Sequence, residues 1–236
     1  MRYERQILVK QIGQQGQEKI IHSKVVVIGA GGLASPVLTY LVCAGVGDIT
    51  IIDYDTVSIT NLNRQFLYGE MDINESKSYR AKEVLNRMNS EVIIHSIRER
   101  VCQDNIMRLI EGADVVIDCV DNIETRLIVN RGCLMMGIPL VEGGINGLYG
   151  FVMVVRREGP CLECMGYHNT KLKPPVPVLG AIVGVIGSLQ AVECIKILLG
   201  LEEVLYGKML NYDGLTGSFE TIDLVRNEDC EAHRLL

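Results

Sequence analysis

The chain has 236 residues, of which 48% are hydrophobic and 5% aromatic, and its formal net charge at pH 7 is −6. This length allows one large α/β domain or one domain with a small appendage, and the composition suits an aliphatic core. Because no internal repeat or linker interrupts the chain, we expect one domain over residues 1–236. The acidic balance argues against general binding of nucleic acid, which favours basic surfaces. Residues 1–6 contain no apolar run, so we expect no secretory signal.

Strands and helices alternate along the first part of the chain. Residues 1–22 predict an amphipathic helical arm, and the β-branched run at 24–28 predicts the first strand. Beyond them, the predicted helices are 33–44, 76–88, 104–110 and 124–136, and the predicted strands are 49–53, 92–97, 114–118 and 139–142. This alternation predicts a Rossmann-like, doubly wound sheet that is mainly parallel.

The rest of the chain has a different pattern. The runs at 148–156, 208–212 and 218–224 predict strands between turns, which we expect to join the sheet in antiparallel fashion. A crossover loop at 161–178 and an apolar helix reaching Leu199 lie between them. The uncharged part of that helix ends at Glu193, short of the roughly 20 residues that span a bilayer. We therefore expect a helix buried in the protein or in a subunit interface, and no membrane insertion.

A glycine-rich turn follows the first predicted strand. Gly29, Gly31 and Ala34 match the dinucleotide fingerprint, and Gly32 lies within it. Such a turn lets a phosphate approach the backbone amides that open the next helix. Asp53 ends the second strand about 20 residues on, where an acid accepts hydrogen bonds from ribose hydroxyls. The motif predicts a nucleotide site, with NAD as the general expectation from the motif alone.

Polar residues after Asp53 favour phosphate chemistry instead. They are Asp55, Asn61, Arg64, Gln65 and Lys77. Nucleotidyl transfer needs cations beside the phosphates, because charge builds on their nonbridging oxygens, and Arg64 and Lys77 supply them. An NAD-dependent oxidoreductase, the alternative, would need a substrate domain for which little chain remains.

Two acids follow the fourth parallel strand of the prediction. Asp118 and Asp121 lie at the edge where ligands of doubly wound sheets bind. The Asp121 carboxylate could hold Mg²⁺ together with phosphates and water. Asp121 or Asn122 could also cap the following helix, and the two roles are compatible. We expect Asp121 to bind magnesium, with Asn122 beside the nucleotide.

Two chelating pairs stand far apart in the sequence. One pair is Cys161 and Cys164, and the other is Cys230 and His233. Together they have the residue types and spacing of a closed, tetrahedral structural zinc site. His168 competes for the fourth position, and a redox role of Cys161 and Cys164 is the other alternative. The eight cysteines do not form a disulfide pattern, so we expect a reducing, cytoplasmic location.

Together these motifs resemble the MoeB/ThiF/HesA adenylyltransferases of the ubiquitin-activating-enzyme superfamily, over residues 1–233. The resemblance rests on Lys77 and on the segments 2–6, 29–33, 44–47, 53–65, 118–122 and 184–191. It implies a single ThiF-type adenylation domain that works as a homodimer, with an arm at 1–22 and a zinc-binding tail at 225–236.

The resemblance also implies a reaction. ATP would activate the C-terminal glycine of a small ubiquitin-like sulfur-carrier protein ending in Gly-Gly, giving an acyl-adenylate and pyrophosphate. The implied roles are ribose binding by Asp53, triphosphate binding by Asn61, Arg64 and Lys77, Mg²⁺ binding by Asp121, and an arginine finger, Arg5, that enters the other subunit's site. A sulfurtransferase is a further candidate partner. The carrier is not identified, so molybdenum cofactor and thiamine synthesis both stay open.

Three departures from the family pattern matter. Ala34 replaces a common glycine, and His233 stands where many relatives have cysteine. The loop from Met165 to Leu179 contains no cysteine, so we expect no covalent carrier intermediate on it. Two further alternatives stay open, which are activation of another peptide C-terminus and a nucleotide-binding zinc scaffold without catalysis.

Overall fold

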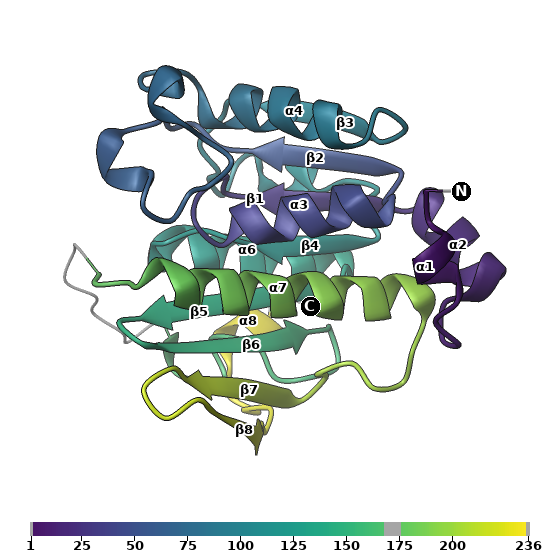
Figure 1. Cartoon of the computed structure of the whole chain (residues 1–236). Helices are drawn as coiled ribbons and strands as arrows, with labels where there is room; N and C mark the ends of the chain where they lie inside the picture. The colour runs from purple at the N-terminus through teal and green to yellow at the C-terminus, as the bar shows by residue number, and fades with distance from the viewer. Residues whose placement is uncertain (1, 168–175, 235–236) are drawn as a thin grey trace.

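The computed structural model describes residues 2–167 and 176–234. In this part of the chain, eight strands form one sheet in the order β3-β2-β1-β4-β5-β6-β7-β8 (Figure 1). The strands are β1 (Lys24–Ile28), β2 (Asp48–Ile52), β3 (Ile93–Ile97), β4 (Val115–Asp118), β5 (Leu140–Asn146), β6 (Tyr149–Val155), β7 (Lys208–Asp213) and β8 (Ser218–Asp223). The helices are α1 (Glu4–Ile7), α2 (Gly13–Ile21), α3 (Ala34–Ala44), α4 (Lys77–Met88), α5 (Ile106–Leu109), α6 (Ile123–Met136), α7 (Gly180–Leu199) and α8 (Glu231–Arg234), with short 3₁₀ turns η1 (Ile59–Asn61) and η2 (Glu70–Asp72).

The sheet changes character along its width. β3, β2, β1, β4 and β5 are parallel, and β6, β7 and β8 follow β5 in antiparallel pairs. The predicted mixed sheet, mainly parallel with antiparallel C-terminal strands, is confirmed. The chain runs outward from β1 to β3 and then returns to place β4 on the other side of β1. Ligands of open α/β sheets bind at such a reversal, beyond the carboxyl ends of the strands.

Helices cover both faces of the sheet. α3, α4 and α7 pack over one face and bury residues such as Val27, Ile51 and Leu38. α5, α6 and α8 belong to the opposite face, where Ile28 and Val116 are buried. α7 runs across the sheet beside α3 (Figure 1). Within the described residues, it alone is long and apolar enough to cross a bilayer, but half of that stretch is buried inside the protein, as a core helix requires.

The N-terminal arm consists of two helices, where the sequence predicts one helical lead-in. Gly13, at the start of α2, has a φ of +57°. The arm is fixed to the far end of α3. Gln6 Nε2 donates to the Ala44 carbonyl over 3.0 Å, and a Cβ at Gly45 would lie 2.5 Å from the Tyr3 ring. Only glycine leaves room for Tyr3 there.

Candidate functional site

The glycine turn lies at the chain reversal, between β1 and α3. Gly29 has a φ of +92°, and a Cβ there would lie 2.7 Å from the Cys119 carbonyl oxygen, so only glycine fits. Asp53 accepts hydrogen bonds of 2.7 Å from the backbone N–H groups of Ala30 and Asp55. Burial raises the pKa of Asp53, and these two N–H donors oppose the shift. The predicted ribose acid is thus fixed against the predicted phosphate turn, and its oxygens retain lone pairs for further donors.

Arg64 and Gln65 lie against the same turn. A Cβ at Gly31 would lie 3.5 Å from Gln65 Nε2, and one at Gly32 would lie 3.6 Å from Arg64 Cγ. Arg64 donates to the Thr60 carbonyl over 2.8 Å, and no carboxylate of the described residues pairs with it. Arg64 Nη1 also donates to Asn63 Oδ1 over 3.0 Å. Gln65 Oε1 is buried without a donor. A ligand at this turn would therefore find a guanidinium whose charge no described carboxylate balances and an unsatisfied acceptor, both of which suit a nucleotide.

Lys77 opens α4 and points back toward the same edge of the sheet. Its side chain is 8% exposed, and Nζ lies 3.4 Å from Asp55 Oδ2. Tyr68, also buried, places its hydroxyl 2.7 Å from the Ala30 carbonyl and 3.1 Å from the Lys77 carbonyl. Tyr68 therefore links Lys77 to the glycine turn. The sequence analysis did not identify Tyr68, because a single tyrosine belongs to no spacing pattern.

Both asparagines predicted to bind the nucleotide have local hydrogen bonds. Asn61 Oδ1 accepts from Ser58 N over 3.1 Å and closes η1. Asn122 Oδ1 accepts from Thr125 N over 2.9 Å and caps α6. In residues 2–167 and 176–234, the side-chain NH₂ groups of these two asparagines donate to no acceptor. Because Asn122 is the cap, the Asp121 carboxylate is not needed for that role.

Asp121 is exposed at this edge and makes no hydrogen bond or ion pair within the described part of the chain. Asp121 follows β4, whose last residue, Asp118, is the register partner of Ile28, the residue immediately before Gly29 of the glycine turn. An unpaired carboxylate beside a phosphate site suits Mg²⁺. The structure thus brings together, at one edge of the sheet, Gly29, Gly31, Gly32, Asp53, Asp55, Asn61, Arg64, Gln65, Lys77, Asp121 and Asn122.

Arg5 lies apart from these residues. It belongs to α1, which contacts the last residue of α3, whereas the glycine turn precedes the first residue of that helix. The 11 residues of α3 separate the two places, a distance of about 16 Å along a helix. The Arg5 side chain is exposed and makes no hydrogen bond or ion pair with the described residues. The structure therefore does not bring Arg5 into the nucleotide site of its own chain.

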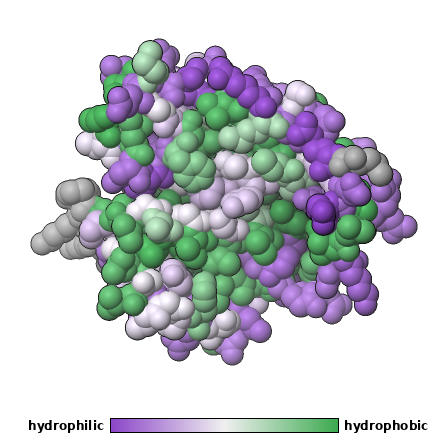
Figure 2. All heavy atoms as spheres, viewed as in Figure 1, coloured by the Kyte–Doolittle hydropathy of each residue, from purple (hydrophilic) through white to green (hydrophobic). Residues whose placement is uncertain are grey.

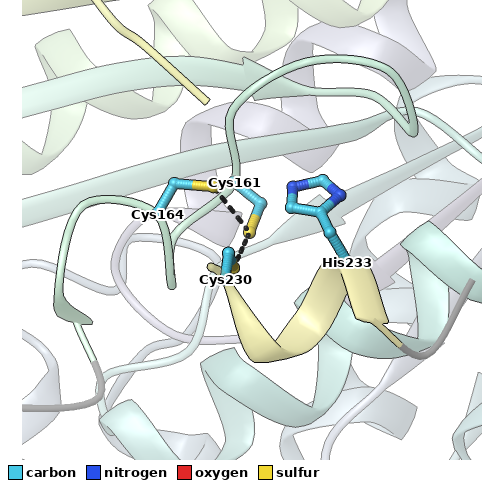
Figure 3. A group of neighbouring side chains, drawn as sticks. All are labelled: Cys161, Cys164, Cys230 and His233. Carbon is cyan, nitrogen blue, oxygen red and sulfur yellow. Dashed lines mark hydrogen bonds between the residues drawn. The ribbon is translucent and has the colours of Figure 1, made fainter. Parts of the chain in front are cut away.

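The two predicted chelating pairs meet on the α6 side of the sheet. The ligand atoms of Cys161, Cys164, Cys230 and His233 all lie within 4.8 Å of one another (Figure 3). Cys161 Sγ lies 3.8 Å from Cys164 Sγ and 3.7 Å from Cys230 Sγ. Tetrahedral zinc with Zn–S bonds of about 2.3 Å separates its sulfurs by about 3.8 Å, whereas a disulfide needs about 2.05 Å. Both ring nitrogens of His233 are buried without a partner in the described residues. These residues fit zinc, and His168 lies outside the described residues.

Residues that sequence reasoning did not identify hold this cluster in place. Glu163, between the two cysteines, is 3% exposed. Arg131 of α6 donates to both of its carboxylate oxygens over 2.7 Å. The two cysteines of the loop are thereby joined to α6, whose first turn is capped by Asn122 at the nucleotide edge. No spacing in the sequence connects Arg131 with Glu163.

The chain is similar in sequence and in fold to proteins of known family. The family model described as ThiF family matches residues 3–232. "Adenylyltransferase and sulfurtransferase MOCS3" of Culex quinquefasciatus is 41% identical over 98% of this chain, which spans only 54% of that relative, about half its length. "Sulfur carrier protein adenylyltransferase" of Thermus thermophilus is 38% identical, over 97% of this chain and 89% of the relative. The solved structure of E. coli MccB with ATP shares the fold, with a TM-score of 0.87 and 24% identity over 99% of this chain and 75% of that one. The chain belongs to the ThiF family.

Proposed function

We propose that this protein uses ATP to adenylate the C-terminal carboxylate of a small ubiquitin-like sulfur-carrier protein that ends in Gly-Gly. One observation carries the proposal. The glycine turn, the acid Asp53, the cations Arg64 and Lys77 and the unpaired carboxylate of Asp121 meet at the carboxyl edge of the sheet. The relatives from Culex quinquefasciatus and Thermus thermophilus, both named as adenylyltransferases, support it.

The reaction needs positioning and charge stabilisation more than proton transfer. An oxygen of the carrier's terminal carboxylate forms a bond to the α-phosphorus of ATP, and the bond from that phosphorus to the bridging oxygen of pyrophosphate breaks. The carboxylate is already ionised at neutral pH, so no side chain has to act as a base. Charge develops on the oxygens of the phosphates, where the guanidinium of Arg64 and the ammonium of Lys77 stabilise it.

The other residues of the edge bind and orient the nucleotide. Asp53 accepts hydrogen bonds from the ribose, and the backbone N–H groups after Gly29 face the phosphates. Gln65, with its unsatisfied acceptor, and the NH₂ groups of Asn61 and Asn122 complete the polar lining. Asp121 would hold Mg²⁺, which neutralises phosphate charge when bound.

We propose a homodimer in which Arg5 enters the nucleotide site of the partner subunit. Arg5 is remote from the site of its own chain and has no partner in the described residues. Apolar residues are exposed on the adjoining helices, such as Tyr40 of α3 and Val192 of α7, each at least 50% exposed. Figure 2 shows hydrophobic residues at the surface over α7 and the neighbouring strands. A dimer contact on this face would cover them.

We further propose that zinc fills the cluster of Cys161, Cys164, Cys230 and His233 and serves structure alone. Four protein ligands complete a tetrahedral site and leave no open position for substrate or water. Thiolate ligands persist in a reducing compartment, so the proposal places the protein in the cytoplasm.

Exchange of radiolabelled pyrophosphate into ATP tests the proposed function. Purified enzyme with Mg²⁺, ATP and each of several Gly-Gly-ending carrier proteins should show exchange that depends on one carrier. A carrier lacking its last glycine is the matched control and should give none. Exchange with an unrelated peptide only would indicate activation of another C-terminus, and a carrier-independent absorbance change with NAD would indicate an oxidoreductase.

A further inference from the structure

A buried polar cluster lies directly behind Asp121 and has no role in the proposed reaction. It consists of Asp118, Arg126, Glu142 and Gln190, whose exposures are 0%, 6%, 0% and 0%. Burying four polar side chains, three of them ionisable, is costly unless they hydrogen-bond to one another or to the backbone. Their contacts converge on the turn from Asp118 to Asn122.

Arg126 of α6 holds that turn from one face of the sheet. Its Nη2 donates to the Val120 carbonyl over 2.7 Å. Its Nη1 donates to Glu142 Oε2 over 2.7 Å and to the Gly143 carbonyl over 2.8 Å, both on β5. The planar guanidinium thus fixes the turn after β4 relative to the neighbouring strand. The carbonyl that it holds belongs to the residue immediately before Asp121.

Gln190 of α7 holds the turn from the opposite face. Its Nε2 donates to the Asp118 carbonyl over 2.8 Å. A Cβ at Gly143 would lie 2.5 Å from Gln190 Cδ, so only glycine lets this side chain reach the strand. The Asp118 carboxylate itself closes the turn by accepting from Val120 N over 2.7 Å. The backbone before Asp121 is therefore held by two helices and by its own first residue.

The charges of the cluster balance with one proton. Asp118 and Glu142 are register partners on the parallel strands β4 and β5, and both side chains are fully buried. Asp118 Oδ2 and Glu142 Oε1 are buried and have no N–H donor in the described residues. Two fully buried carboxyl groups face one buried cation, Arg126, so the cluster is neutral only when the pair of carboxyl groups holds one proton. The remaining single negative charge is compensated by Arg126.

We propose that Arg126, assisted by Gln190, is a positioning residue that holds Asp121 in place to bind the metal–nucleotide, with Asp118 and Glu142 sharing one proton beside it. The inference rests on the proposed function in so far as Asp121 acts on Mg²⁺ and ATP. Partners that orient a metal ligand are typically worth about 10–100-fold in metal affinity or activity. Arg126 never touches the substrate in this arrangement and acts through Asp121.

The test compares two variants that differ only at position 126. Glu142→Gln supplies an NH₂ group in place of the shared proton, so it should fold and bind Mg²⁺-ATP within about twofold of the wild type. Adding Arg126→Gln removes the donors to Val120 and Gly143. Asp118, left without its cation, then takes up the proton that keeps the buried cluster neutral. Calorimetry with ATP and Mg²⁺ should then show affinity reduced at least about tenfold.

Two readouts separate positioning from a general loss of stability. Asp121→Asn should weaken Mg²⁺-ATP binding in the Glu142→Gln background but cause no further loss once Arg126 is replaced. Equal losses in both backgrounds would overturn the proposal. Hydrogen exchange without nucleotide should become faster at the amides of residues 120–122 when Arg126 is replaced, and unchanged exchange would also overturn it.

The experiments distinguish failure of this inference from failure of the proposed function. A wild-type protein that binds no Mg²⁺-ATP would refute the proposed function, while hydrogen exchange would still decide whether Arg126 holds the turn. If the double variant does not fold, Arg126→Lys keeps the charge but reaches fewer of the three acceptors. Arg126→Lys should give faster hydrogen exchange at residues 120–122 and a smaller loss of Mg²⁺-ATP affinity than the double variant. Wild-type values of both quantities would count against the proposal.

Discussion

The Sγ atoms of Cys161 and Cys230 lie 3.7 Å apart although the two residues are 69 positions apart in the sequence. The chain between them includes α7, β7 and β8. A metal ion at this point would join the β6–α7 connection to α8, so the effect of removing it should be on stability. Structural zinc contributes about 10–16 kcal/mol in zinc-finger peptides.

Replacing Cys230 with alanine should release zinc and lower the melting temperature. In a chain of this size, each 1 kcal/mol lost lowers the melting temperature by about 2–4 °C. Metal analysis and thermal denaturation measure the two effects. Cys43→Ala is the matched control, because Cys43 is exposed and remote from the cluster, and it should retain zinc. Carefully prepared wild-type protein without zinc would contradict the structural role.

Arg64→Ala and Lys77→Ala should each abolish carrier-dependent pyrophosphate exchange while the fold is kept. Both cations stand at the glycine turn, and cations that stabilise transferring phosphoryl groups contribute about 10³–10⁵ in rate. Arg87→Ala, an exposed cation on α4, serves as control and should keep full exchange. A variant at Arg64 or Lys77 with a tenth of wild-type exchange would count against its assignment.

Mixing Arg5→Ala with Asp121→Ala should restore exchange activity that neither variant has alone. In a hybrid dimer, one of the two sites receives Arg5 from one subunit and Asp121 from the other. Differently tagged subunits allow hybrids to be purified and assayed directly. Verified hybrids without activity would mean that Arg5 does not act across the interface.

Glu142 should make stability depend on pH. Burial, then the Asp118 charge, raise the pKa of Glu142 well above its ordinary value of 4.5, and Arg126 opposes the shift. Above pH 4.5, up to the raised pKa, the folded state holds one proton more than the unfolded state. The free energy of unfolding therefore falls as pH rises. Glu142 has two titratable partners within the buried cluster, Asp118 and Arg126. The other titratable groups that interact electrostatically with members of the cluster are Asp121, Cys119, Cys133 and Tyr167.

The measurement is denaturant unfolding of the wild type and Glu142→Gln between pH 5 and 8. The variant lacks the titrating carboxyl, so its stability should fall less steeply with rising pH. Its gain over the wild type should grow toward the alkaline end. Two parallel curves would show that Glu142 is ionised in the folded protein across this range.

The alternation of elements was predictable because it depends on local patterns. The β-branched run at 24–28 and the glycine turn after it are contiguous, so strand, turn and helix follow from neighbouring residues. The meeting of the chelating pairs was also predictable, since ligand type and spacing indicate a metal site without knowledge of the fold. The position of residues after predicted strands, together with the family resemblance, suggested the site residues Asp53, Arg64, Lys77 and Asp121. In the structure these residues lie at the same edge of the sheet, as expected.

The buried partners of these residues were not predictable. Glu142 meets Asp118 because β5 pairs with β4 in one particular register, which no local pattern encodes. Arg126 looks in the sequence like a solvated helix residue, and Glu163 like a spacer between cysteines. The break between α1 and α2 was missed because an isolated glycine such as Gly13 is also tolerated inside a helical pattern.

The distance along the chain between the proposed zinc ligands has a consequence for synthesis of the protein. Ribosomes build the chain from its N-terminus at about 5–20 residues per second, and domains begin to fold as they emerge. Cys161 and Cys164 are therefore made well before Cys230 and His233, and a chain interrupted after β8 carries only half of the ligand set. Such a fragment could form every strand of the sheet and still fail to retain the metal. With zinc bound as proposed, retention of the ion would distinguish finished chains from interrupted ones.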